Sequence, residues 1–147
     1  LMKVKIEYPT KAEEKDMLKL LTSVTDFDSI EINEILNKDK IEKIKQIIKE
    51  IHIDEKLMDY ILDIVFKTRE TNNYIACGAS PRASIALVVS AKANAFLEGR
   101  DYVIPQDIKR VIFDVLRHRM ILTYEAEAEG KKVEDIITDI LEIVELP

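Results

Sequence analysis

The sequence has few of the residues that cross-link or punctuate small proteins. Of its 147 residues one is cysteine (Cys77), none is tryptophan, three are glycine and four are proline. A single cysteine excludes an internal disulfide and fits a reducing compartment, so we expect a cytoplasmic protein. Neither a signal-peptide pattern nor an uninterrupted apolar run of about 20 residues appears in these residues, so no membrane span is expected.

Acidic side chains only slightly outnumber basic ones. The 22 basic and 28 acidic side chains give a formal net charge of −6. This balance, without a continuous basic face, argues against nucleic-acid binding, including a helix-turn-helix mode. His52 and His118 have no cysteine or histidine at metal-ligand spacing, so no metal site is expected. The 47% hydrophobic content is enough for a core without disulfides or metals.

Apolar residues recur at helical spacing along most of the chain, which predicts an all-α helical bundle. We expect a first helix from Thr10 to about Leu21, and then a less patterned stretch over 22–40, interpreted as a loop plus a short helix. Further helices are predicted over 41–50, 54–69, 81–97, 105–120 and 133–144. The residues near His52 and near Tyr102 are candidates for a minor two-stranded pairing.

Residues 2–8 follow a different pattern from the rest of the chain. Apolar and charged residues alternate strictly there, which predicts a β-strand. A lone strand is unstable, and the sequence begins with Leu1 rather than methionine, so we expect its partner strands in an upstream part of a longer protein. The predicted division is therefore residues 1–9 as strand and hinge, and residues 10–147 as a helical domain.

The stretch CGASPRASIA, residues 77–86, contains one cation in an unfavourable place. Ser80 and Pro81 are typical of a helix start, so Arg82 falls in the first turn, facing the positive end of the helix dipole. Unpaired amides at a helix start bind phosphate, and an arginine there adds a planar fork of donors. Local physics alone still favours a surface arginine paired with a neighbouring acid.

Other candidate sites have simpler structural explanations. Arg69 ends a predicted helix and stabilises its C-terminus, although the fold could bring it near Arg82. The cluster Arg117-His118-Arg119 also lies late in a helix. Tyr8 could stack on a base at the hinge or belong to a core, and Cys77 is expected to be a small buried thiol. No P-loop, magnesium-binding acid pair or catalytic triad can be assigned.

The order of these segments resembles the C-terminal part of the MoxR family of AAA+ ATPases. The resemblance covers essentially the whole chain and is densest over 68–122. It is carried by LMKVKIEYP, by TRE, by GASPRASIALVVSAKANAFLEGRDYVIPQDIKRVIFDVLRHRMIL and by the final ELP. One departure is Ile104, where the family commonly has a threonine that caps the next helix, so we expect this helix start to be less firmly held.

The resemblance implies that this chain is an all-helical lid domain and that an α/β nucleotide-binding core, with residues 1–9 as its last strand and hinge, forms the rest of the protein. Arg82 would be the sensor-two arginine that reaches the γ-phosphate of ATP. Gly78 would let the chain turn near the nucleotide, and Pro81 would fix the helix start. Tyr8 is a further, weaker nucleotide-binding candidate.

The same resemblance implies ATP and Mg²⁺ as cofactors of the longer protein, with neither held by this chain alone. The expected partners are the AAA+ core, neighbouring subunits of a ring and an unidentified client protein, but no nucleic acid or membrane. The alternative is a helical protein-interaction module with no role in nucleotide binding.

Overall fold

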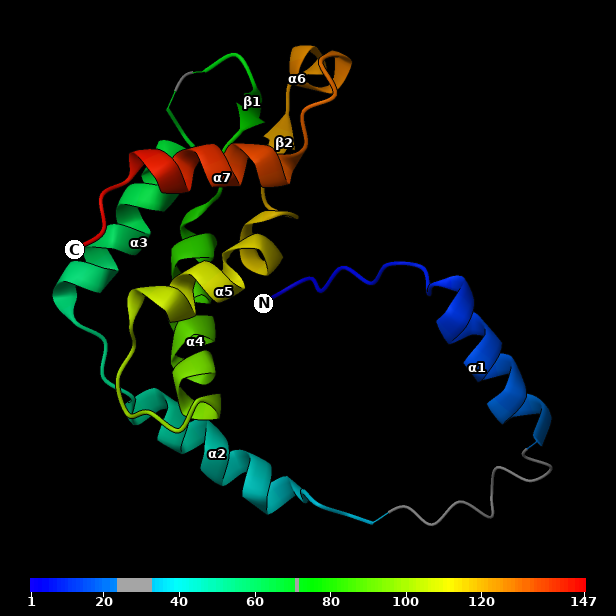
Figure 1. Ribbon diagram of the computed structural model, residues 1–147. Coiled ribbons are helices and arrows are strands. Elements are labelled where there is room, and N and C mark those ends of the chain that lie inside the picture. The colour runs from blue at the N-terminus through cyan, green and yellow to red at the C-terminus, as the bar shows by residue number, and fades with distance from the viewer. Residues whose placement is uncertain (24–32, 71) are drawn as a thin grey trace.

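The computed structural model describes residues 1–23, 33–70 and 72–147. In these ranges the chain is mainly helical, as the sequence predicts, with one two-stranded antiparallel sheet (Figure 1). The helices are α1 (Lys11–Ser23), α2 (Lys38–Glu50), α3 (Glu55–Lys67), α4 (Pro81–Leu97), α5 (Pro105–Leu116), α6 (Tyr124–Ala128) and α7 (Val133–Ile143). The strands are β1 (Ile75–Cys77) and β2 (Ile121–Leu122).

Helix α4 lies at the centre of the helical body and packs against α2, α3 and α5 (Figure 1). Its inward face consists mostly of small residues, which allow neighbouring helices to approach closely. Its buried residues are Ala83, Ala86, Leu87, Ser90, Ala91 and Ala95. The sequence correctly predicts this central position. It does not predict that Ile85 and Val89, on the other side of the helix, and Leu97, its last residue, stay exposed.

Most of the predicted helix boundaries are confirmed. Asp54 is the N-cap of α3, and its side chain accepts a hydrogen bond from the Lys56 amide. Gly99 follows α4 with a φ of 72°, the left-handed conformation in which glycine usually ends a helix. The predicted apolar stripes of α5 and α7 face the core. No helix of the described residues is long and apolar enough to cross a bilayer.

Two short pairings of extended segments join the helices. His52 and Tyr102 form an isolated parallel bridge, which confirms the predicted contact between their segments. Strands β1 and β2 pair antiparallel, with Ile75 opposite Leu122. The sequence does not predict this second pairing, because so short a strand inside an Asn-rich loop is formed by tertiary contact rather than by a local pattern.

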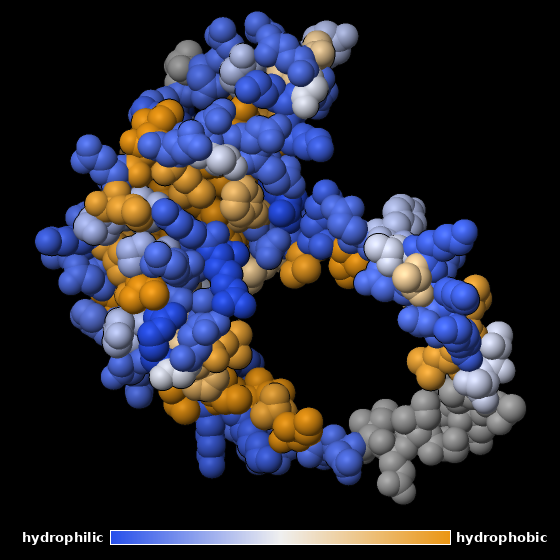
Figure 2. Space-filling view, in the orientation of Figure 1, coloured by the Kyte–Doolittle hydropathy of each residue, from blue (hydrophilic) through white to orange (hydrophobic). Residues whose placement is uncertain are grey.

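The strand predicted over residues 2–8 is not formed. Residues 1–10 belong to no helix or strand and are exposed, because no neighbour in the described part of the chain offers them a ladder of backbone hydrogen bonds. Helix α1 forms as predicted but buries none of its residues and lies apart from the helical body (Figure 1). Figure 2 shows hydrophobic side chains at the surfaces of both α1 and α2.

The stretch 22–40 is only partly covered by the structure. Residues 24–32, where the sequence predicts part of a loop and a short helix, lie outside the described residues. Residues 33–37 form no helix or strand. Helix α2 then begins at Lys38, three residues before the predicted start, and the Asn37 side chain accepts a hydrogen bond from the Lys40 amide at this end.

A buried carboxylate holds the turn between α4 and α5. Asp107 is 1% exposed and accepts hydrogen bonds from both terminal nitrogens of Arg100 at 2.8 and 2.6 Å. It also accepts from the Asn94 amide at 2.7 Å and from the Ile104 backbone at 2.8 Å. Ile104 cannot cap α5 with its side chain, but the Asp107 carboxylate binds the Ile104 amide and holds the start of the helix instead. The expectation of a loosely held start is therefore wrong. An acid three residues after the N-cap is a signal that sequence reasoning could have used.

These contacts decide the ionisation of Asp107. Burial alone would raise its pKa, but hydrogen bonds from Arg100, the Ile104 amide and Asn94 outweigh burial and hold the pKa below its usual value. A carboxyl whose pKa is lower in the folded than in the unfolded state stabilises the fold above the unfolded pKa. That contribution is lost as the pH falls through the folded pKa.

The C-terminal end of α3 holds the segment that leads into α4. Thr68 is fully buried, and its hydroxyl donates to the Val65 carbonyl at 2.7 Å and accepts from the Ala79 amide at 2.9 Å. Arg69 Nε donates to the Ala79 carbonyl at 2.7 Å. Both backbone groups of Ala79 are thus bound by the two residues that follow α3, so the start of α4 is placed by tertiary contacts as well as by its own sequence.

We predict that Asp107→Asn lowers the free energy of unfolding by about 2–3 kcal/mol at pH 7, because Arg100 loses the charge of its buried partner. Urea denaturation measures this loss, and the difference between variant and parent should shrink below about pH 4. The control Glu98→Gln removes the exposed ion pair with Arg110 and should change stability by less than about 0.5 kcal/mol. A loss that does not depend on pH would contradict the assigned ionisation.

We also predict that Thr68→Val lowers the free energy of unfolding by about 1–3 kcal/mol, because the buried Ala79 amide loses its acceptor. Thr68→Ser is the matched control, since it keeps the hydroxyl and removes only a methyl group. Denaturation of both variants separates the hydrogen bond from packing. If valine proved no worse than serine, the hydroxyl would not hold this junction.

Candidate functional site

Arg82 lies in the first turn of α4, on the exposed side of the helix start. Ser80 is the N-cap with extended backbone angles, as predicted, and Pro81 follows it. The Ser80 side chain makes no capping hydrogen bond, and no acidic residue lies in this turn. The Ser80 hydroxyl and the Arg82 guanidinium are therefore both available to an anion that approaches the positive end of the helix.

Arg82 differs from the other arginines of the chain. The other five each donate a hydrogen bond to a carboxylate or a backbone carbonyl: Arg69, Arg100, Arg110, Arg117 and Arg119. Within residues 1–23, 33–70 and 72–147, Arg82 makes neither a hydrogen bond nor an ion pair. The alternative of a surface arginine paired with a neighbouring acid thus finds no such acid in these ranges.

Gly78 is required by close packing, and its expected place near the nucleotide stays a prediction. Its φ is not positive, so it is not required for an unusual turn. A Cβ atom at this position would instead lie 2.3 Å from the Thr68 carbonyl oxygen, which is a steric clash. Glycine is needed here because the backbone of residue 78 packs directly on the end of α3.

The fold does bring Arg69 toward the start of α4. Its guanidinium donates to the carbonyl of Ala79, three residues before Arg82, and lies 4.8 Å from the centre of the Phe66 ring. Arg69 is thereby bound to protein groups, which supports a positioning role. The preferred explanation, a cation that stabilises the end of its own helix, does not describe this contact.

Two minor candidates lie in surroundings unlike those expected. Tyr8 is 98% exposed on the N-terminal segment, so it belongs to no core in this chain, and its stacking on a base stays a prediction. Cys77 ends β1 and is exposed, so the expectation of a buried thiol is wrong. In the described ranges no group of three or more His, Cys, Asp or Glu side chains could hold a metal ion.

The basic cluster after α5 links structural elements. Arg117 Nε donates to Glu134 at the start of α7 at 2.6 Å, and its Nη1 donates to Asp114 at 2.9 Å. These two carboxylates raise the pKa of Arg117, Asp114 most strongly, although burial opposes them. His118 is exposed between the two arginines. Interhelical ion pairing, rather than the helix dipole alone, therefore accounts for Arg117.

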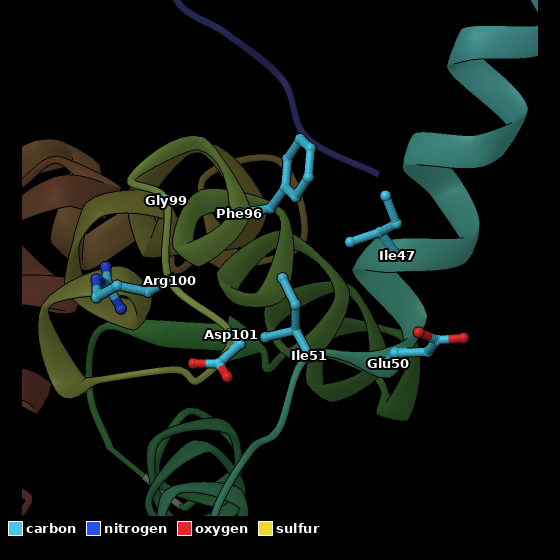
Figure 3. A pocket seen from close by; sticks show the side chains of 7 residues that line it. All are labelled: Ile47, Glu50, Ile51, Phe96, Gly99, Arg100 and Asp101. Carbon is cyan, nitrogen blue, oxygen red and sulfur yellow. The ribbon is translucent and has the colours of Figure 1, made fainter.

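A pocket in the described part of the chain lies away from Arg82. It has a volume of about 470 Å³ and lies between the C-terminal ends of α2 and α4 (Figure 3). Its lining residues are Ile47, Glu50, Ile51, Phe96, Gly99, Arg100 and Asp101. Because Arg82 begins α4 and Gly99 follows its end, the two sites are about 25 Å apart along the helix. The Arg100 side chain points away from the other labelled side chains (Figure 3), and its guanidinium is paired with Asp107 rather than free for a phosphate.

A second cavity, an open groove, begins one helical turn after Arg82 in α4. Helices α3 and α4 form an apolar groove of about 280 Å³. It is lined by Met58, Ile61, Leu62, Ser84, Ile85, Val88 and Val89. Residues 82, 85 and 89 share one face of α4 at helical spacing. Arg82 thus lies at the end of an exposed apolar surface, which is an arrangement suited to contact with other protein.

Comparison with known proteins agrees with this geometry. Residues 68–140, which include Thr68, Gly78 and Arg82, match the family of AAA lid domains. The chain is 36% identical over its whole length to Chaperone MoxR1 of Mycobacterium tuberculosis, and 36% identical over its whole length to protein YeaC of Bacillus subtilis. Those alignments span 40% and 45% of the two relatives, so the chain spans less than half of their length.

A solved structure shows the same arrangement of elements. The crystal structure of a proposed ATPase from Cytophaga hutchinsonii superposes with a TM-score of 0.89 at 37% identity, over 99% of this chain and 46% of that one. Protein MoxR of Methylorubrum extorquens is 42% identical over 72 residues, which cover 48% of this chain and 21% of that protein. The chain therefore belongs to the MoxR family of AAA+ ATPases and corresponds to a lid domain of that family.

Proposed function

We propose that this chain is the nucleotide-sensing lid of a MoxR-like AAA+ ATPase and that Arg82 is its sensor-two residue. The observation that carries the proposal is the state of Arg82. It is the arginine without a protein partner in the described ranges, it is exposed, and it lies at the start of a long helix whose lead-in is rigidly held. A γ-phosphate would supply the missing anion.

The surrounding structure supports a sensing role because it fixes the position of the Arg82 backbone. Thr68 and Arg69 bind both backbone groups of Ala79, and Gly78 packs on the end of α3. A contact between Arg82 and a phosphate would therefore be transmitted to α3 and α4 together, rather than absorbed by a loose loop. Loss of the γ-phosphate on hydrolysis would then release the helical body as one unit.

The remaining parts of the proposal concern the longer protein. ATP and Mg²⁺ would be held mainly by an α/β core, with Arg82 as the contribution of this chain, and residues 1–9 would be the last strand and hinge of that core. The exposed apolar surfaces of α1 and of the groove between α3 and α4 would contact the core or a neighbouring ring subunit. Remodelling or maturation of a client protein would be the output of the cycle.

The test is the complete protein with Arg82→Ala. Turnover of ATP should fall at least about tenfold, because a charge aimed at a transferring phosphoryl group is lost. Arg82→Lys should recover part of the rate, since it keeps the charge but not the planar fork. Arg110→Ala is the matched control, as it removes an exposed arginine whose partner in the described ranges is Glu98.

Steady-state hydrolysis measures the rates, and thermal unfolding verifies that each variant is folded. Near-normal turnover in folded Arg82→Ala would reject the sensor role. That result would favour the alternative, a helical interaction module that acts through its apolar groove without a role in nucleotide binding.

A further inference from the structure

The C-terminal end of α5 holds the N-terminal segment by its backbone. The Lys3 amide donates to the Asp114 carbonyl at 2.8 Å. Arg117 Nη1 donates to the Lys3 carbonyl at 3.3 Å, and Arg119 Nη2 donates to the Leu1 carbonyl at 3.0 Å. In the described part of the chain, these are the hydrogen bonds that join residues 1–9 to the helical body.

The side chains of this segment contribute little to its attachment. Its apolar residues Met2, Val4, Ile6 and Tyr8 are exposed, and Lys5 pairs with Glu7 of the same segment. Contacts to backbone groups fix the direction of a chain whatever its side chains are. The path of residues 1–3 is therefore set by α5 rather than by burial of the segment.

The side chains of Arg117 and Arg119, which donate to the backbone of residues 1–3, are held in different ways. Arg117 is braced by Asp114 on its own helix and by Glu134 on α7, so its guanidinium has a fixed orientation. Arg119 is half-buried beside Leu1, and its Nε is buried without a partner in the described ranges. A buried, unpaired donor is costly, so Arg119 has a capacity for a further acceptor at this junction.

We propose that the Asp114 carbonyl, Arg117 and Arg119 form a backbone clamp that sets the angle at which residues 1–9 leave the helical body. Arg117 and Arg119 are then positioning residues for ATP turnover, although neither touches nucleotide. This second step rests on the proposed function, in which residues 1–9 lead to the nucleotide-binding core. Helix α4, which carries Arg82, packs on α5, which carries the clamp, so a movement at one end reaches the other through a packed core.

The experiment uses the complete protein with the variants Arg119→Gln and Arg119→Lys. The control is Arg110→Gln, because Arg110 lies on α5 and its hydrogen bond in the described ranges is to Glu98 rather than to residues 1–9. Hydrogen exchange is followed in the peptide that covers residues 1–9, together with the kcat and KM for ATP. We expect about fivefold faster exchange in Arg119→Gln from loss of one backbone contact, with partial recovery in Arg119→Lys. The kcat should fall about threefold or more with KM changed by less than about twofold, since the loss concerns coupling rather than binding.

Each result decides one step. Unchanged exchange in a folded Arg119→Gln variant overturns the clamp. Faster exchange with an unchanged kcat overturns the coupling between the clamp and ATP turnover. The contacts would then only attach residues 1–9 to the helical body. If Arg82→Ala leaves turnover normal, the proposed function fails, but the exchange measurement still decides whether the clamp exists. Arg117→Gln is a second variant, and the loss of its contact with Glu134 is monitored by thermal unfolding.

Discussion

The structure depends on the close packing of α4 among its neighbours. Its buried face is built from alanines around Leu87, so α5, α3 and α2 can all approach it. A larger residue on this face would push the neighbouring helices apart. Because α4 is held along its length, the first turn with Arg82 is presented at a fixed place on the surface.

Two of the buried polar side chains, Thr68 and Asp107, lie where helices join and stabilise these junctions by hydrogen bonds in addition to packing. Thr68 and Asp107 are both almost inaccessible to solvent. Thr68 accepts from the Ala79 amide in the connection after α3, and Asp107 accepts from the Ile104 amide in the connection before α5. Thr68 fixes the segment that enters α4 against the end of α3. Asp107 of α5 fixes the other end of α4 through its hydrogen bonds with Asn94 and Arg100. A phosphate contact at Arg82 would therefore act on a braced element.

The arginines of this chain show how charge is divided between structure and function. Arg100 and Arg117 use their planar forks to bind carboxylates, and Arg69 and Arg119 donate to backbone carbonyls. These contacts stabilise particular junctions between segments. Arg82 has no such contact in the described ranges, and its exposed position at a helix start is the arrangement that an anion would stabilise. The contrast within one chain is more informative than the exposure of Arg82 alone.

The sequence by itself determined the all-α class, most helix boundaries and the exposed arginine at a helix start. These features follow from local rules: apolar residues at helical spacing, Asp54 and Ser80 at N-caps, and Gly99 at a C-terminus. Only the tertiary structure decided the pairing of β1 with β2, the reason for glycine at residue 78, the partners of Thr68 and Asp107, and the backbone hydrogen bonds of residues 1–3 at the end of α5. Each of these depends on a contact between residues that are separate along the chain, and no local pattern records which distant backbone groups will meet.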